Sequence, residues 1–481
     1  MGSITVSARA GAPEQTAADT RVIGLFEGES LSEGPLQALV DLGEAKGAIR
    51  KVAVAHEEAP GGGQRRVLIA GLGKRADFDA ERARVAAAAA AARAKELGAA
   101  ALSWAVPAGD EVAGAIVEGT LLRLYEFDRF KSSNGEEDSA LASLEVVGDA
   151  VDAAALDVSR IAAEAANAVR DLQNLPSNVA TPSFLAARAS EIAEEHESLE
   201  VELLDREAIL ARGIGAFAAV AQGSYEEPRL IVLRYRPPGA TGPHLAYVGK
   251  AVTFDTGGIS IKPSSKMQEM KFDMSGGAAV LEATAAIARL GLDVTLTAIV
   301  PATENMPSGR SVKPGDIVTA MNGKTIEINN TDAEGRLILA DALAYAVEQG
   351  AERLLDIATL TGGVLVALGH THSGLWSNDD DWFRAVEASC DATGEIGWRM
   401  PLHPEYLELT KGTYADLQNS SDQRLAVSNY AAEFLRQFVS DRPWVHVDIA
   451  GTAWGSTRNY LGKGASGFGA RMLIDLARRA G

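Results

Sequence analysis

Two segments of the sequence concentrate side chains that can do chemistry. The first, residues 249–277, reads GKAVTFDTGGISIKPSSKMQEMKFDMSGG and lies between a short apolar run and an alanine-rich stretch, which is typical of a long connection at the end of a strand. The second, residues 329–337, reads NNTDAEGRL. Their charged residues include Lys250, Asp255, Lys262, Lys271, Asp273, Asp332, Glu334 and Arg336. Buried charges require partners or a metal ion, whereas the same charges on a solvated surface loop would do nothing.

The four carboxylates of Asp255, Asp273, Asp332 and Glu334 would repel one another strongly if they met without a cation. A pair of divalent ions about 3.5 to 4 Å apart resolves this repulsion, with some carboxylates bridging, as in two-metal hydrolases. Lys250 could join such a site only as a neutral amine, which a nearby dication would favour by lowering the lysine pKa. Oxygen ligands with one nitrogen suit Zn²⁺, Mn²⁺, Co²⁺ or Mg²⁺ alike.

An alternation of strand and helix patterns positions both segments. From Thr181-Pro182 onward, it predicts a single larger domain in which helices flank a central sheet. We expect strands at 199–204, 230–233, 245–248, 294–300, 353–358 and 444–449, and helices at 276–290, 337–348 and 467–478. Asn322-Gly323 predicts a hairpin with a type I′ turn. The carboxylates therefore fall at strand ends and in loops of one domain.

The first 165 residues show the same alternation on a smaller scale. Short β-rich runs at 4–7, 21–25, 52–54 and 67–70 alternate with helical patterns, including the alanines at 86–92. Gly71-Leu72-Gly73-Lys74 lacks the spacing and hydroxyl residue of a phosphate-binding loop, so we interpret it as a plain turn. The sequence thus predicts a two-domain α/β protein: a smaller N-terminal α/β domain at 1–165 and a larger C-terminal catalytic domain at 166–481, with a central mixed sheet flanked by helices.

The amino-acid composition limits the classes of partner that the protein is expected to bind. Lys and Arg number 45 against 65 Asp and Glu, and the formal net charge of -20 argues against general affinity for nucleic acid or an anionic membrane. The single cysteine, Cys390, cannot form an internal disulfide, and we predict that it packs within a helix. The pair His370 and His372 lacks partners at zinc-site spacing and is interpreted as structural. Because secretory and membrane-spanning patterns are missing, we expect a soluble, cytoplasmic protein.

Residues 330–337, NTDAEGRL, resemble the signature octapeptide of the leucine aminopeptidase (cytosol aminopeptidase) family. The same family's sequence blocks are similar to GKAVTFDTGGISIKP at 249–263, KFDMSGGAAV at 271–280, ATLTGG at 358–363 and HVDIAGTAW at 446–454. They are also similar to YEFDRFKS at 125–132 and RDLQNLPSNVATP at 170–182. The resemblance therefore covers nearly the whole chain, and an eight-residue motif with collinear companions is very specific.

The resemblance implies two divalent metal ions per subunit, Mn²⁺ or Zn²⁺, as cofactors. The implied ligands are Lys250, Asp255, Asp273 and Glu334 for one ion, and Asp255, Asp332 and Glu334 for the other, with Asp255 and Glu334 bridging. Lys262 would polarise the scissile carbonyl group of a peptide. Arg336 would hold a bicarbonate ion that serves as general base, because a planar guanidinium suits a planar anion.

The resemblance also implies a substrate pocket, an assembly and an activity. A pocket for leucine-like P1 side chains would be lined by Met270, Thr359, Gly362, Ala450 and Ala453, which could otherwise be ordinary core residues. Members of the family assemble as two stacked trimers, so a homohexamer that removes N-terminal amino acids from peptides is expected. The departures from the family pattern, at Ala251, Thr256 and 425–428, remove no implied ligand and bear on substrate preference and packing.

Two other classes of function compete with this hypothesis. A two-metal phosphoesterase would use similar carboxylates but would normally add histidines or a basic phosphate pocket, and neither is present near the two segments. A non-catalytic binding protein on the same fold would be expected to lose an implied ligand or Lys262, and all are retained.

Overall fold

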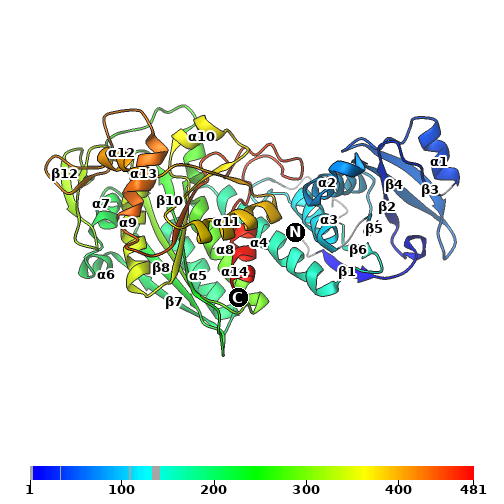
Figure 1. The fold of residues 1–481 in the computed structure, drawn as a ribbon, viewed down its shortest axis with the longest axis horizontal. Coiled ribbons are helices and arrows are strands. Elements are labelled where there is room, and N and C mark those ends of the chain that lie inside the picture. The colour runs from blue at the N-terminus through cyan, green and yellow to red at the C-terminus, as the bar shows by residue number, and fades with distance from the viewer. Residues whose placement is uncertain (1–3, 33, 108–109, 133–140) are drawn as a thin grey trace. The chain divides into compact units, whose positions relative to one another are not determined.

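The computed structural model describes residues 4–32, 34–107, 110–132 and 141–481 and separates into two compact units (Figure 1). One unit contains the chain up to Asn167 together with Thr457–Gly462, and the other contains Ala168–Ser456 together with Lys463–Gly481. Helix α4 (Ala153–Asn174) runs from the first unit into the second. None of the described helices is long and apolar enough to cross a membrane.

The N-terminal unit is built on one mostly parallel sheet. Its strand order is β1-β6-β5-β2-β4-β3, and only the pairing of β3 with β4 is antiparallel among the described strands. The strands are β1 (Thr5–Arg9), β2 (Thr20–Phe26), β3 (Val52–Glu58), β4 (Gln64–Gly73), β5 (Ala101–Ala105) and β6 (Ser143–Val147). The helices are α1 (Gly34–Asp41), α2 (Ala80–Glu96) and α3 (Asp110–Leu124). The alanine-rich helix forms as predicted, and its small side chains let α2 pack closely on α3.

The interpretation of Gly71-Leu72-Gly73-Lys74 as a plain turn is wrong. Strand β4 continues to Gly73, and the Gly71 N–H donates to the Lys51 carbonyl at 2.8 Å. A Cβ atom at Gly71 would lie 2.1 Å from the carbonyl oxygen of Ala48. Glycine is needed here because another segment of backbone crosses the strand at close range, which local turn propensity does not reveal.

The C-terminal unit contains the larger, mixed sheet that the sequence predicts. Its strand order is β16-β15-β18-β14-β9-β11-β8-β7, with β10 paired to the far end of β11. The central strands β18, β14, β9 and β11 are mutually parallel, whereas β7, β8 and β15 join in antiparallel pairs. The strands are β7 (Leu199–Leu204), β8 (Arg229–Tyr235), β9 (His244–Gly249), β10 (Ala251–Asp255), β11 (Thr295–Asn305), β14 (Arg353–Ala358), β15 (Ser373–Ser377), β16 (Gly397–Arg399) and β18 (Trp444–Asp448).

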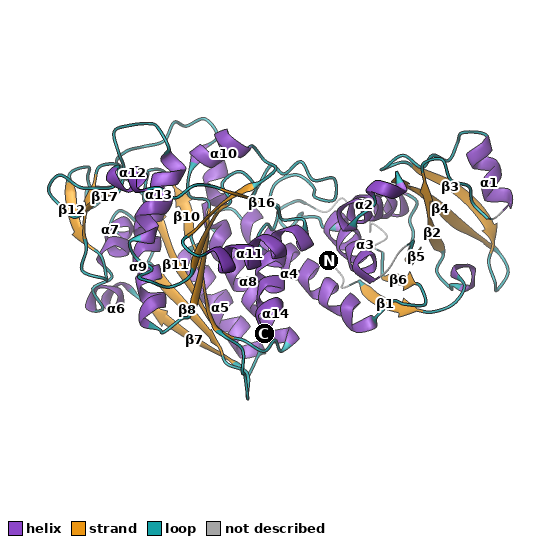
Figure 2. Cartoon of the chain, in the orientation of Figure 1, coloured by secondary structure: helices purple, strands orange, loops and turns teal. Residues whose placement is uncertain are grey.

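Helices cover both faces of this sheet (Figure 2). One face carries α5 (Pro182–Glu195), α8 (Ser275–Leu290), α11 (Asp380–Thr393) and α14 (Ala470–Ala480). The other carries α7 (Gly215–Ala221), α9 (Gly335–Glu348) and α13 (Val427–Arg436). The remaining short helices of the unit are α6 (Arg206–Ala211), α10 (Gly362–Leu368) and α12 (Pro404–Glu408). Cys390 is buried within α11, which confirms its packing role.

Two local expectations in this unit need correction. The connection expected after the strand at 245–248 is partly strand itself, because β10 resumes after Lys250 and pairs with β11, and a 3-10 helix then spans Met267–Met274. The hairpin of β12 (Asp316–Thr319) and β13 (Thr325–Ile328) forms, with β17 (Leu417–Gln418) beside it. Its turn is not type I′, because Gly323 has a φ of 86° but Asn322 has no positive φ. The connection spans residues 320–324, longer than the two-residue loop of a type I′ hairpin.

Candidate metal centre

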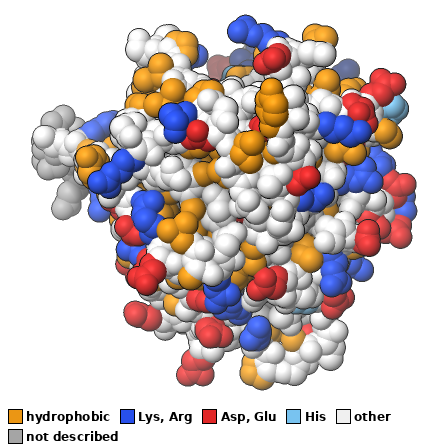
Figure 3. Space-filling model, turned by 90° about the vertical axis from the view of Figure 1, so that its left-hand side faces the viewer, with side chains coloured by type: hydrophobic (Ala, Val, Ile, Leu, Met, Phe, Trp, Pro, Cys, Tyr) orange, Lys and Arg blue, Asp and Glu red, His pale blue; other side chains and the backbone are white. Residues whose placement is uncertain are grey.

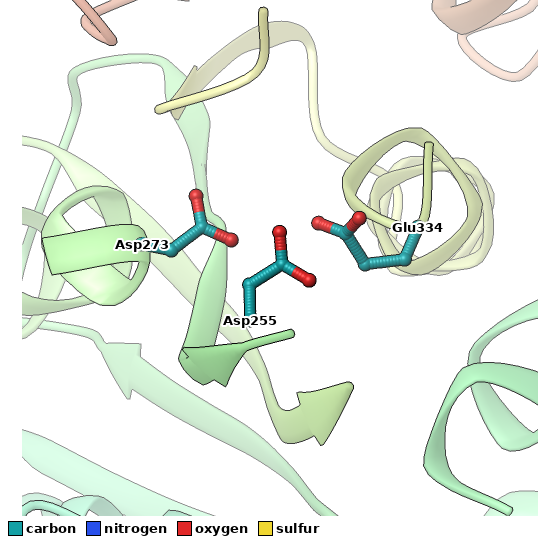
Figure 4. A group of neighbouring side chains, drawn as sticks. All are labelled: Asp255, Asp273 and Glu334. Carbon is teal, nitrogen blue, oxygen red and sulfur yellow. The ribbon is translucent and has the colours of Figure 1, made fainter. Parts of the chain in front are cut away.

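Three carboxylates converge at the carboxyl ends of the central parallel strands. Asp255 is the last residue of β10, Asp273 lies in the 3-10 helix that leads into α8, and Glu334 immediately precedes α9. Figure 4 shows the three side chains directed toward one another. All three are buried, and their ligand oxygens lie within 4.8 Å of one another. The edge of parallel strands where connections leave the sheet is a common place for a binding site, and here it concentrates negative charge.

Glycine allows the ends of two helices to approach this centre. A Cβ atom at Gly335, the first residue of α9, would lie 2.7 Å from Lys250 Nζ. The start of α8 lies against strand β14 at similarly close range, since a Cβ atom at Gly276 would lie 2.0 Å from the Ile357 carbonyl oxygen. Side chains at either position would push the carboxylates and lysine apart, so these glycines bring the site together.

Lys250 is a buried cation between two of the carboxylates. Its Nζ lies 2.8 Å from Asp273 Oδ2 and 2.8 Å from Glu334 Oε1, and it donates to the Thr359 carbonyl at 3.1 Å. Burial by itself would lower the pKa of Lys250, but the charges of Asp273, Glu334 and Asp255 outweigh it and raise that pKa. In this arrangement the ammonium group is therefore charged and offsets part of the repulsion.

Lys262 joins the fourth carboxylate to the cluster. Its Nζ lies 2.8 Å from Asp255 Oδ2 and also contacts Asp332 Oδ1. The side chains of Lys262 and Asp332 are 22% and 30% exposed, so this pair lies at the open edge of the site, whereas Lys250 is 3% exposed. Burial and the charge of Asp255 raise the pKa of Asp332 to about 6, against the opposing effect of Lys262.

Neutral donors orient two of the carboxylates. Asp255 Oδ1 accepts from Asn305 Nδ2 at 2.8 Å and from the Gly257 N–H at 2.9 Å. Asp273 Oδ1 accepts from Thr359 Oγ1 at 2.7 Å. Asn305 is not among the predicted site residues, because the apolar run predicts a strand that ends at residue 300, whereas β11 runs to 305. A polar residue that closes a long apolar strand would have been the signal.

The donor set fits a divalent cation. Glu334 Oε2 is buried and has no hydrogen-bond partner among the described residues. Asp273 Oδ2 and Asp332 Oδ1 are also buried without a well-oriented hydrogen bond, although each lies beside a lysine. The four carboxylates and the two lysines together leave two net negative charges. Buried oxygens with unused lone pairs and excess negative charge are what a hard or borderline dication requires.

Arg336 is a buried cation in the first turn of α9. Its Nη1 donates to the Asn419 carbonyl at 2.5 Å, and its Nε has no hydrogen-bond partner in the described part of the chain. No ion pair joins it to a carboxylate of the described residues. Burial lowers the pKa of Arg336, as expected for a charge that lacks a counter-ion. Such a guanidinium has N–H groups free to bind an anion.

The residues of the predicted substrate pocket lie on loops that pack together at the same edge of the sheet. They are Met270 in the 3-10 helix, Thr359 after β14, Gly362 at the start of α10, and Ala450 and Ala453 after β18. Asp448 links the loop after β14 to the loop after β18, because its Oδ1 accepts from the Leu360 N–H at 3.0 Å and from the Ala450 N–H at 3.1 Å. Phe272 stacks on Trp454 with ring centroids 5.4 Å apart, which holds the 3-10 helix beside the loop after β18.

Two other predicted groups lie elsewhere. Lys271 donates to the Asn174 carbonyl at 2.8 Å and makes no ion pair with the carboxylate cluster described above. His370 Nδ1 lies 2.7 Å from the Gly451 carbonyl oxygen, and His372 makes an edge contact with Trp398 at 6.0 Å. These contacts agree with a structural role for the histidine pair.

Both parts of the chain are similar to known protein domains. Residues 167–474 match the catalytic domain of the cytosol aminopeptidase family, and residues 22–134 match that family's N-terminal domain. A probable cytosol aminopeptidase of Solibacter usitatus is 46% identical over 96% of this chain and 97% of that protein. Another probable cytosol aminopeptidase, from Roseiflexus castenholzii, is 43% identical over 98% of this chain and 99% of that protein.

A solved structure shares the whole architecture. The bottromycin maturation enzyme BotP in complex with Mn is 33% identical and has a TM-score of 0.87, with 96% of this chain and 99% of that chain covered. The agreement thus extends over both units and includes the segments that carry the carboxylates and lysines. We conclude that the chain belongs to the cytosol aminopeptidase family.

Proposed function

We propose that this protein is a two-metal leucyl aminopeptidase, which releases N-terminal amino acids from peptides and prefers leucine-like residues. Its family makes it a peptidase and a hydrolase, and the proposal adds the metals and the preference. The observation that carries the proposal is the buried group of Asp255, Asp273 and Glu334, whose oxygens lie within 4.8 Å of one another. Carboxylates this close together repel one another, so we expect metal ions to occupy the site in the active peptidase.

The residues that would hold two divalent ions, Mn²⁺ or Zn²⁺, are Lys250, Asp255, Asp273, Asp332 and Glu334. When bound, such ions polarise a carbonyl group and lower the pKa of a bound water. Lys250 must be neutral to act as a ligand, which requires that the carboxylates now raising its pKa be neutralised by the ions. The similar BotP structure is a complex with Mn, which supports Mn²⁺ as the first ion to test.

Lys262 and Arg336 are the proposed catalytic residues. Lys262 is partly exposed at the open edge of the cluster, so its ammonium group can stabilise negative charge that develops on the scissile carbonyl oxygen. Arg336 is buried with a free Nε, and we propose that it holds a bicarbonate ion that accepts a proton from the attacking water. The assignment of each role follows the family resemblance, and the burial and contacts support it.

The proposed P1 pocket consists of Met270, Thr359, Gly362, Ala450 and Ala453. Ala450 and Ala453 carry small side chains, which a pocket for a branched aliphatic side chain would require. Comparing kcat/KM for leucyl, alanyl and glutamyl p-nitroanilides tests the preference. A preference for glutamyl substrate would contradict this pocket.

We also propose that the active form is a homohexamer and that the protein is cytoplasmic. The domain boundary at residue 165 stays a prediction. Light scattering on the active protein should give about six times the chain mass of 50.3 kDa. A fully active monomer would contradict the assembly. General binding to nucleic acid is not expected at a net charge of -20, and acidic and basic side chains are interspersed on the face drawn in Figure 3.

The decisive experiment measures metal content and activity together. Chelator-treated protein is reloaded with Mn²⁺, and hydrolysis of leucyl-p-nitroanilide is compared with that of p-nitrophenyl phosphate. We expect two ions per chain and activity on the anilide alone. Hydrolysis of the phosphate ester would favour a phosphoesterase, and bound metal without either activity would favour a binding protein. Glu334→Gln should lose metal and activity, whereas the exposed Glu408→Gln, which loses a surface pair with Lys411, should lose neither.

A further inference from the structure

Arg336 packs against the ring of Tyr430, which is not among the predicted site residues. The Arg336 Cζ lies 5.2 Å from the centroid of the Tyr430 ring, and the two side chains are 4% and 3% exposed. The guanidinium is therefore held between the Asn419 carbonyl and one buried aromatic side chain.

Helix α13 fixes the position of Tyr430. The Tyr430 N–H donates to the Ala426 carbonyl at 3.0 Å, so the residue lies in the first turns of the helix. Two residues earlier, Ser428 Oγ lies 2.6 Å from Thr361 Oγ1, which donates to Asp448 Oδ2 at 2.7 Å. The start of α13 is thus attached to the same strand-end loops that form the site, and α13 also packs on α9. The ring has a defined place beside Arg336.

We propose that Tyr430 is a positioning residue that holds the Arg336 guanidinium in the orientation needed to bind an anion. This inference rests on the proposed function, in which that anion is bicarbonate. A ring on one side and a carbonyl on Nη1 leave the remaining N–H groups of the guanidinium for a planar, bidentate ligand. A desolvated cation–π contact stabilises the charged guanidinium, with which no carboxylate of the described residues forms a direct ion pair.

The ring and the hydroxyl group make separable contributions. Phenylalanine at position 430 would keep the cation–π contact and the packing but lose the phenol oxygen, whereas alanine would lose both. If Tyr430 served only as a core residue, its loss would affect anion binding no more than a change at another buried aromatic residue of α13. Tyr430→Ala therefore tests the ring against such a control, and Tyr430→Phe, the variant expected to keep the fold, tests the hydroxyl group.

The experiment uses the Mn²⁺-loaded full-length protein and three variants: Tyr430→Phe, Tyr430→Ala and the control Phe434→Leu. Phe434 is buried on the same helix and packs on Phe438, with ring centroids 5.3 Å apart. Hydrolysis of leucyl-p-nitroanilide is followed as bicarbonate is added to carbonate-depleted buffer. A second measurement, made without substrate, is the rise in Tm that bicarbonate produces, because a ligand that binds only the native state stabilises it more when it binds more tightly.

We expect the half-activating bicarbonate concentration to rise about 30-fold in Tyr430→Ala, from loss of the desolvated cation–π contact, and less than about threefold in Tyr430→Phe, which keeps the ring. The kcat at saturating bicarbonate should change little, the rise in Tm should shrink in the same order, and Phe434→Leu should match the wild type in both. A wild type that does not hydrolyse the anilide would overturn the proposed function itself. An active wild type with no response to bicarbonate, or a Tyr430→Ala variant whose bicarbonate curve and Tm response match an active wild type, would overturn the role of Tyr430 and leave the peptidase proposal intact.

Discussion

Replacing Lys250 by methionine tests how the buried carboxylates are held together. Lys250 Nζ lies 2.8 Å from both Asp273 Oδ2 and Glu334 Oε1, and all three residues are buried. Methionine keeps the length of the side chain and removes its charge. Breaking a buried ion pair by removing one partner costs about 3 to 5 kcal/mol. Because this ammonium serves two carboxylates, we expect the free energy of unfolding of the chelated protein to fall by about 4 kcal/mol.

Urea unfolding in excess chelator, followed by tryptophan fluorescence, measures this loss. Five of the six tryptophans, all but Trp104, lie within the residue ranges of the catalytic unit, so the signal reports mainly on that unit. At a slope of about 3 kcal/mol per M, a loss of about 4 kcal/mol lowers the midpoint by about 1.3 M. Added Mn²⁺ should raise the midpoint of the variant, because the ion restores positive charge to the cluster.

Lys271→Met is the matched control. Lys271 follows in the same segment, donates to the Asn174 carbonyl at 2.8 Å and has a pKa lowered by burial, the opposite of Lys250. Its loss removes one hydrogen bond to a carbonyl and should cost about 1.5 kcal/mol. Equal midpoints for the wild type and Lys250→Met in chelator, or equal losses for the two lysine variants, would refute the conclusion that Lys250 balances the cluster.

Three further predictions follow from the same contacts. Lys262→Ala should lower kcat by about 100 to 1,000-fold with little change in metal content, because it removes a cation from developing oxyanion charge, and rescue by excess metal would contradict this role. Asp332→Asn should lower metal occupancy and activity together with the circular dichroism spectrum unchanged, whereas two bound ions and normal turnover would show that Asp332 is not a ligand. Asp341 in α9 accepts from the Phe217 and Met321 N–H groups, and burial raises its pKa from 3.8 to about 7. Between these values the folded state binds more protons than the unfolded state, so the free energy of unfolding should fall as pH rises from about 4 to about 7 and then level off. Asp341→Asn should flatten this slope in urea titrations from pH 5 to 8, and an unchanged slope would assign the titration to another group.

The elements with strong periodic signals were predictable. Strands at 199–204 and 353–358 have the predicted bounds, because alternating or continuous apolar runs directly reflect which faces are buried. Boundaries set by contacts with distant residues were not predictable. The local sequence around Gly71 predicts a turn, but in the structure the Ala48 backbone crosses a strand there. Similarly, β11 extends to Asn305 because β10 pairs with its end. The turn type at Gly323 was likewise not predictable, because the connection between the strands is longer than the Asn-Gly pair indicates.

The sequence by itself determined the chemistry that this protein has available. The carboxylates, lysines and arginine of two short segments, and the alternation of strands and helices around them, are local properties that can be read along the chain. Only the tertiary structure decided how these groups are paired. Asp255, Asp273 and Glu334 share one buried centre, Asp332 joins it through Lys262, and Arg336 lies against Tyr430. Such pairings depend on parallel strands that bring distant loops to one edge of a sheet, so no local pattern encodes them.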